Sequence, residues 1–109
     1  MEERTRLLKE EPQPIAWLVI TSGRRAGRIC RLSNVVNIGR DAAQNDLVLD
    51  DEAVSAQHAR IRLEGRQYVL YDLASTNGTF VNGRRVYRWP LMDGDEITVG
   101  MTSLVFKAL

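Results

Sequence analysis

The chain has 109 residues, of which 44% are hydrophobic, and this is enough material for one domain with its own core. Fifteen basic and fourteen acidic residues leave a formal net charge of +1, which excludes a global field that would gather nucleic acid or an anionic membrane. The single cysteine, Cys30, excludes an internal disulfide, and no apolar run approaches the roughly 20 residues of a membrane span. We therefore expect a cytoplasmic protein with no metal, no cofactor and no membrane association.

The first 14 residues differ in composition from the rest of the chain. They are charged, contain Pro12 and Pro14, and lack an apolar face that would dock on a core. We expect residues 1–14 to form a flexible tail and residues 15–109 to form the folded domain.

From residue 15 onward, short β-rich runs alternate with turn residues, a pattern typical of an all-β sandwich or barrel. The predicted strands are 16–21, 28–32, 35–39, 47–49, 59–63, 68–72, 79–81, 96–99 and 103–107. In the run 58–63, alternation places Ala59 and Ile61 on one face, with His58 and Arg60 on the other. Pairs such as Asn77-Gly78 supply positive-φ turns, so antiparallel hairpins are expected.

Small polar and basic residues gather where predicted strands end. The clusters are Gly39-Arg40, Ser55-Ala56-Gln57-His58 and Ser75-Thr76-Asn77-Gly78-Thr79. An arginine fork, hydroxyl groups and backbone amides are the donors that bind an anion such as phosphate. Taken singly, an arginine such as Arg40 is more often a solvated surface charge, and residues such as Ser55 and Thr76 are more often turn or cap residues. The order of the whole set favours a phosphate-binding surface without a catalytic nucleophile.

Residues 37–106 resemble the forkhead-associated (FHA) domain family. The family's blocks appear in order and with similar spacing, as Gly39-Arg40, Asn45-Asp46-Leu47, Val54-Ser55 with His58, Asp72-Leu73, Ser75-Thr76-Asn77-Gly78-Thr79, Val81-Asn82-Gly83, Gly94-Asp95 and Gly100. The resemblance implies an all-β sandwich of two mainly antiparallel sheets with about eleven strands. It also implies a non-catalytic module that binds phosphothreonine peptides in Ser/Thr-kinase signalling through loops at one end.

The resemblance assigns roles to individual residues. Arg40 would contact the phosphate with its guanidinium group, Ser55 would donate its hydroxyl, and Thr76 would complete the phosphate site. Asn77 would hydrogen-bond the peptide backbone beside the phosphothreonine. Asn82 is assigned either a weaker backbone contact or a structural role in its own turn.

Three further residues are expected to act through structure. Gly39 and Gly78 would matter for the backbone shape of their loops, and the family's matching histidine implies that His58 is a buried brace. A histidine near a serine also raises a hydrolase hypothesis. The chain has no Gly-X-Ser-X-Gly nucleophile elbow, so we expect no enzyme.

Two departures from the family pattern concern specificity. Ala56 follows Ser55 where a polar or basic residue often adds a phosphate contact, so one donor is missing unless Gln57 compensates. Ala53 stands where some members carry an arginine that selects an acidic residue three positions after the phosphothreonine. An aliphatic preference at that peptide position is therefore expected.

Thr5 raises a regulatory hypothesis because acidic residues precede it and Leu8 follows three positions later. If a kinase phosphorylates Thr5, the tail would occupy the domain's own site, or that of a neighbour, and cause autoinhibition. A phosphorylated Thr5 form that stays monomeric and binds external phosphopeptide with full affinity would contradict this hypothesis.

The expected partner is a phosphothreonine-containing protein, either a Ser/Thr kinase or a kinase substrate, and the sequence leaves the oligomeric state open. The alternative is a phosphate-independent docking or self-assembly module on the same fold, with the Trp89-Pro90-Leu91 segment as an apolar anchor. Trp89 itself is expected to pack against the sandwich. Nucleic acid is not expected, because the arginines are scattered among acidic residues.

Overall fold

The computed structural model describes residues 13–109, and within this range the chain forms strands and loops but no helix. The strands are β1 (Ala16–Ile20), β2 (Ile29–Arg31), β3 (Val35–Gly39), β4 (Leu47–Val48), β5 (Ala59–Glu64), β6 (Gln67–Asp72), β7 (Thr79–Val81), β8 (Arg84–Val86), β9 (Arg88–Pro90), β10 (Glu96–Val99) and β11 (Thr102–Ala108). Accordingly, no helix in residues 13–109 is long and apolar enough to cross a membrane.

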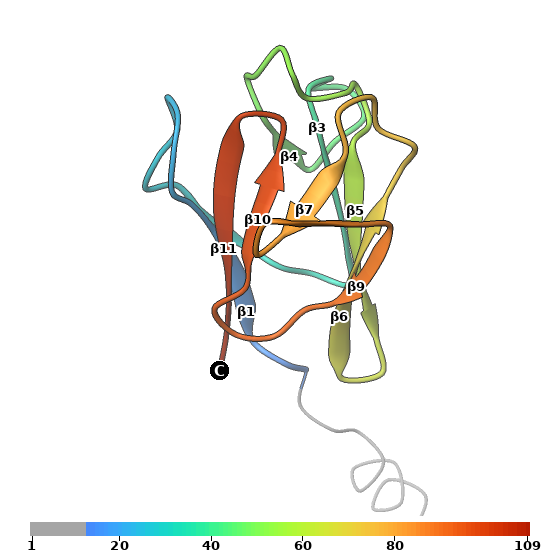
Figure 1. Ribbon diagram of the computed structural model, residues 1–109. Coiled ribbons are helices and arrows are strands. Elements are labelled where there is room, and N and C mark those ends of the chain that lie inside the picture. The colour runs from blue at the N-terminus through green and yellow to red at the C-terminus, as the bar shows by residue number, and fades with distance from the viewer. Residues whose placement is uncertain (1–12) are drawn as a thin grey trace, which may run out of the picture.

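The strands form two sheets that pack face to face (Figure 1). One sheet has the order β2-β1-β11-β10-β7-β8, and the other has the order β4-β3-β5-β6-β9. Strands β3 and β4 pair in parallel, whereas the other neighbouring strands pair in antiparallel orientation. The predicted sandwich of two mainly antiparallel sheets is confirmed.

Strand alternation builds the core between the sheets. In β1, Ala16, Leu18 and Ile20 are buried and their neighbours are half-buried. Tyr68 on β6 of one sheet contacts Phe106 on β11 of the other sheet edge to face, with ring centroids 5.9 Å apart. Inward-facing side chains of both sheets therefore form a single cluster.

The alternation predicted for residues 58–63 is correct for the strand but wrong for His58. Ala59 and Ile61 are fully buried, and Arg60 and Arg62 lie on the outer face. His58 is also fully buried, because β5 begins only at Ala59 and the chain turns before it. The inward–outward alternation of side chains therefore does not extend from β5 into the loop before it.

Strands β8 and β9 were absent from the predicted set. Arg84-Arg85-Val86 and Arg88-Trp89-Pro90 have little apolar alternation, and they pair at the sheet edges with β7 and β6. Trp89, in the segment that the docking alternative uses as an apolar anchor, packs against the sandwich as expected. Its ring is half-buried against the core, and its Nε1–H donates to Asp95 Oδ2 at 3.3 Å.

The loops that contain the predicted site lie at one end of the sandwich. Figure 1 shows the connections near β3, β4 and β7 and the β10–β11 turn at the top, and the C-terminus at the bottom. At that lower end, Leu109 N–H donates to Ile15 O at 3.0 Å. The two sheets thus present a set of loops away from the chain ends that the structure describes.

Candidate functional site

Three loops meet at the upper end, and the loop before β5 lies between the other two. Arg40 N–H donates to Ser55 O at 3.0 Å, and Asp41 N–H donates to Ala56 O at 3.2 Å. From the opposite side, Thr76 N–H donates to Ser55 Oγ at 3.1 Å. The structure therefore brings Arg40, Ser55 and Thr76 together, although 36 positions of sequence separate the first from the last.

Arg40 is exposed but its side chain is fixed in direction. Its Nε–H donates to Val54 O at 2.9 Å, which leaves both Nη nitrogens for another acceptor. Within residues 13–109, no acidic side chain forms an ion pair with Arg40. The neighbouring Asp41 carboxylate accepts from Ala43 N–H and Gln44 Nε2 in its own loop. An anion would thus meet an oriented guanidinium group that has no competing carboxylate partner.

Ser55 and Thr76 supply hydroxyl groups beside this arginine. Ser55 Oγ accepts the Thr76 N–H, and its own proton is available for donation to a ligand. Ser55 is half-buried and Thr76 is exposed. One arginine and two hydroxyl groups match the acceptor-rich surface of a phosphate.

Asn77 is exposed and anchored by one end of its amide. Its Nδ2 donates to Ala53 O at 2.8 Å, and its Oδ1 has no partner among residues 13–109. Ala53 thus holds Asn77 through its carbonyl group, as Val54 holds Arg40. A free side-chain carbonyl next to Thr76 can accept a hydrogen bond from the backbone N–H of an extended peptide.

His58 braces the loops from below. Its Nδ1 accepts the Ser55 N–H at 3.0 Å, so the proton of the neutral ring is on Nε2, which donates to Gly78 O at 2.9 Å. The same residue donates its backbone N–H to Ile38 O and accepts the Leu73 N–H. His58 is fully buried and both ring nitrogens are occupied, which fits a structural brace and not a general base.

A carboxylate that the sequence reasoning gave no role organises the loop between β6 and β7. Asp72 accepts hydrogen bonds from Ser75 N–H, Ser75 Oγ–H and Thr79 Oγ1–H, while Gly78 N–H donates to Ser75 Oγ. Partial burial raises the pKa of Asp72, but these hydrogen bonds outweigh that effect and lower the pKa overall. The Asp-X-X-Ser spacing is a local signal that would have found this cluster.

The two glycines expected to shape the loops do so for different reasons. A Cβ on Gly39 would lie 2.3 Å from Ala56 O and 2.7 Å from Asn45 Nδ2, so only glycine permits the close approach of the loops. Gly78 has φ +89°, a conformation that favours glycine, and an added Cβ would lie 2.9 Å from Arg85 Nε. Arg85 is a neighbour of the site that the sequence did not indicate.

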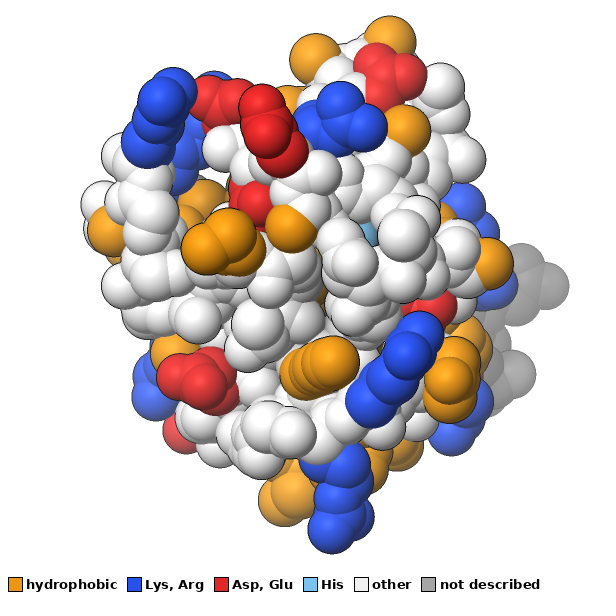
Figure 2. Space-filling model, turned by 45° about the horizontal axis from the view of Figure 1, so that its top comes forward, with side chains coloured by type: hydrophobic (Ala, Val, Ile, Leu, Met, Phe, Trp, Pro, Cys, Tyr) orange, Lys and Arg blue, Asp and Glu red, His pale blue; other side chains and the backbone are white. Residues whose placement is uncertain are grey.

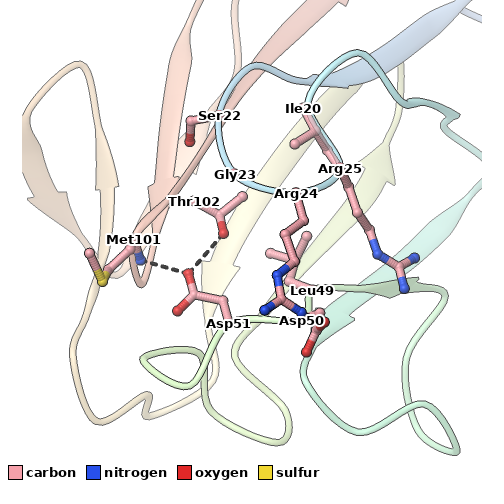
Figure 3. A pocket seen from close by; sticks show the side chains of 10 residues that line it. All are labelled: Ile20, Ser22, Gly23, Arg24, Arg25, Leu49, Asp50, Asp51, Met101 and Thr102. Atoms are coloured by element: carbon pink, nitrogen blue, oxygen red, sulfur yellow. Dashed lines mark hydrogen bonds and ion pairs between the residues drawn. The ribbon is translucent and has the colours of Figure 1, made fainter.

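Asp51 joins the central loop to the β10–β11 turn, as Figure 3 shows. Its Oδ2 accepts from Met101 N–H and Thr102 Oγ1–H, both at 2.8 Å, and Oδ1 accepts from Ala53 N–H. A pocket of about 190 Å³ opens beside it, lined also by Arg24 and Arg25 from the β1–β2 loop. None of the residues lining this pocket is Arg40, Ser55, Thr76 or Asn77, so it is separate from the predicted phosphate site.

The remaining predicted residues lie in different places. Asn82 follows the far end of β7, and its side chain is committed to Asp95 Oδ1 and Glu96 N–H, both at 2.9 Å, which fits the structural alternative. Ala56 and Gln57 are exposed, and Ala56 contributes its carbonyl to the loop contacts. Thr5 lies outside the described residues, so its phosphorylation stays a prediction.

Charged side chains on the loop face are scattered and do not form one field. Figure 2 shows separate Lys or Arg and Asp or Glu groups around a largely uncharged surface. No cluster of three or more His, Cys, Asp or Glu with metal-binding geometry occurs in residues 13–109. Anion recognition at this end would therefore depend on local donors.

Comparison with known proteins identifies the domain. The model of the FHA domain family matches residues 36–100. Glycogen accumulation regulator GarA of Mycolicibacterium smegmatis is 38% identical over 95 residues, which cover 87% of this chain and 60% of GarA. The chain therefore spans well under two thirds of that relative.

Solved structures agree with this match. A domain from an analysis of phosphothreonine-dependent FHA domain interactions has a TM-score of 0.79 and 36% identity, covering 85% of this chain and 95% of its own. Mycobacterium tuberculosis EmbR, in complex with a low-affinity phosphopeptide, has a TM-score of 0.79 and 32% identity, covering 97% of this chain and 29% of EmbR. The chain belongs to the FHA domain family.

Proposed function

We propose that this domain binds phosphothreonine in a partner protein and acts as a non-catalytic module in Ser/Thr-kinase signalling. One set of contacts carries the proposal. Arg40 donates through Nε to Val54 O, directly before Ser55, and Ser55 Oγ accepts the Thr76 N–H, so a guanidinium group and two hydroxyl-bearing residues lie on loops that contact one another. The similarity to domains studied with phosphothreonine and phosphopeptides supports it. The partner is a kinase or a kinase substrate.

The negative charge of the phosphate explains why the domain would bind phosphothreonine and not threonine. Phosphothreonine carries about −1.5 to −2 charge at pH 7, whereas threonine is neutral. Each charge-assisted hydrogen bond contributes about 1.5–3 kcal/mol, and the neutral residue forms none of them. Asn77 then fixes the peptide backbone beside the phosphothreonine, and Ala53 leaves room for an aliphatic residue three positions later.

Calorimetric titration with a phosphothreonine peptide library and matched unphosphorylated peptides tests the function. Arg40→Ala is expected to weaken binding by about 2–5 kcal/mol, which removes detectable heat. The matched control is Arg62→Ala, because Arg62 is exposed on β5 and faces away from the core. Unchanged affinity in Arg40→Ala would contradict the assignment. Equal binding of phosphorylated and unphosphorylated peptides would instead favour the phosphate-independent docking module.

A further inference from the structure

Arg85 lies against the loop that contains Thr76 and Asn77, but nothing in the proposed phosphate site uses it. It is the middle residue of β8, where it pairs with Phe80 of β7. A Cβ added to Gly78 would lie 2.9 Å from Arg85 Nε and 3.1 Å from Arg85 Cζ. The guanidinium group therefore covers the backbone of the residue immediately after Asn77.

The position of this guanidinium group is set by an aromatic ring. Arg85 Cζ lies 5.4 Å from the centroid of the Tyr87 ring, a cation–π contact. Tyr87 is 67% exposed, and Arg85 is exposed as well. The pair thus forms a surface platform beside the loop and does not belong to the core.

The charge of Arg85 is not balanced by an ion pair in the described part of the chain. Within residues 13–109, no acidic side chain pairs with it, whereas Arg24, Arg88 and Lys107 each have an acidic neighbour. An oriented arginine without a carboxylate partner is suited to bind an anion from another molecule.

We propose that Arg85 is a specificity-determining residue that selects an acidic side chain near the phosphothreonine. This inference rests on the proposed function, because it requires a peptide that lies across Thr76 and Asn77. An extended peptide advances about 3.3 Å per residue, so the acidic residue falls within about three positions of the phosphothreonine. The ligand class is a phosphothreonine peptide with a flanking Asp or Glu, and the Arg40 site alone supplies no such preference.

The test exchanges charge on both sides of the contact. Phosphothreonine peptides carrying Ala, Asp or Lys at one position from −3 to +3 are titrated against the unaltered domain and the Arg85→Glu variant. At one position, the unaltered domain is expected to favour Asp over Lys by about two- to fivefold, as for an exposed ion pair. Arg85→Glu should reverse that preference while the alanine peptide keeps nearly the same affinity.

Arg84→Glu is the matched control. Arg84 is exposed on the same strand but pairs with Val81 at the other end of the hairpin, away from Gly78. It should retain the preference of the unaltered domain. If Arg85→Glu leaves the preference for Asp or Lys unchanged at all six positions, the proposal is overturned while phosphothreonine binding stands. If no phosphorylated peptide binds the unaltered domain, the proposed function itself fails.

Discussion

Gly39 and Arg40 are adjacent, and the proposed phosphate site would depend on both in different ways. Arg40 supplies the donors, and Gly39 allows its backbone to lie against Ala56 O and the Asn45 amide. The orientation of Arg40 thus depends on how the loops pack around Gly39 as well as on the hydrogen bond of its own side chain. Specificity for a phosphate requires this direction to be set before the ligand arrives.

Gly39→Ala tests that dependence. The new methyl group would overlap backbone at 2.3 Å, so we expect a loss of about 1–3 kcal/mol in the free energy of unfolding. Displacement of Arg40 should also lower phosphopeptide affinity at least about tenfold. Urea denaturation and calorimetry measure the two effects. Gly65→Ala, strained at φ +66° in the β5–β6 turn but with open space, should lose stability without losing affinity. Retention of full affinity by Gly39→Ala would contradict this account.

Sequence reasoning at this scale identified the polar residues but not their partners. Arg40, Ser55 and Thr76 were predicted to share a site, and the structure places them in hydrogen-bonded loops. The anchoring of Arg40 by Val54 O, and the position of Arg85 beside Gly78, involve residues distant in sequence. No local pattern encodes such contacts.

At the scale of elements, the loops owe their shape to two carboxylates. Asp72 holds the loop between β6 and β7, and Asp51 joins the loop before β5 to the β10–β11 turn. For Asp51 as for Asp72, partial burial raises the pKa, but the hydrogen bonds that each carboxylate accepts outweigh this effect, so the pKa is lowered. A carboxylate with a lowered pKa in the folded state stabilises that state while it is ionised.

The lowered pKa of Asp72 gives a pH prediction. Its stabilisation is complete above the unfolded-state pKa near 4 and is lost as the pH falls through the lower folded-state value. Asp72→Asn should therefore reduce the free energy of unfolding by about 1–3 kcal/mol at pH 7. Its stability should also fall less steeply than that of the unaltered protein below about pH 4.

Thermal or urea unfolding between pH 2 and 7 checks the prediction. Asp50→Asn is the control, because Asp50 is exposed and, among residues 13–109, its carboxylate forms an ion pair only with Arg24, at 3.4 Å. It should change stability little. Equal pH profiles for Asp72→Asn and the unaltered protein would contradict the role assigned to Asp72.

The elements that sequence predicted best are those with an apolar face. β1, β5 and β11 alternate clearly and were expected close to their observed bounds. β8 and β9 could not be predicted from alternation, because they are three-residue edge strands stabilised by pairing with β7 and β6. Strands with an apolar face can be predicted from the local alternation of the sequence. Short edge strands form because they pair with strands that are already in the sheet.

At the scale of the whole molecule, the sandwich acts as a scaffold that separates its loops from its described chain ends (Figure 1). A net charge of +1 provides no long-range attraction for a phosphopeptide. Recognition would then depend on short-range contacts at the loop end and with Arg85 on β8 beside it. The fold class was predictable, and so was the grouping of Arg40, Ser55 and Thr76 on neighbouring loops, whereas the position of Arg85 beside those loops was not.

The most direct test is to follow backbone amide NMR shifts while a phosphothreonine peptide is added. We expect the largest changes at Arg40, Ser55, Thr76 and Gly78, with little change at Ile29 on β2 or Arg62 on β5. The unphosphorylated peptide should leave the spectrum unaltered. Large changes confined to an outer sheet face, or equal changes with both peptides, would contradict the conclusion that this domain reads phosphothreonine through its loops.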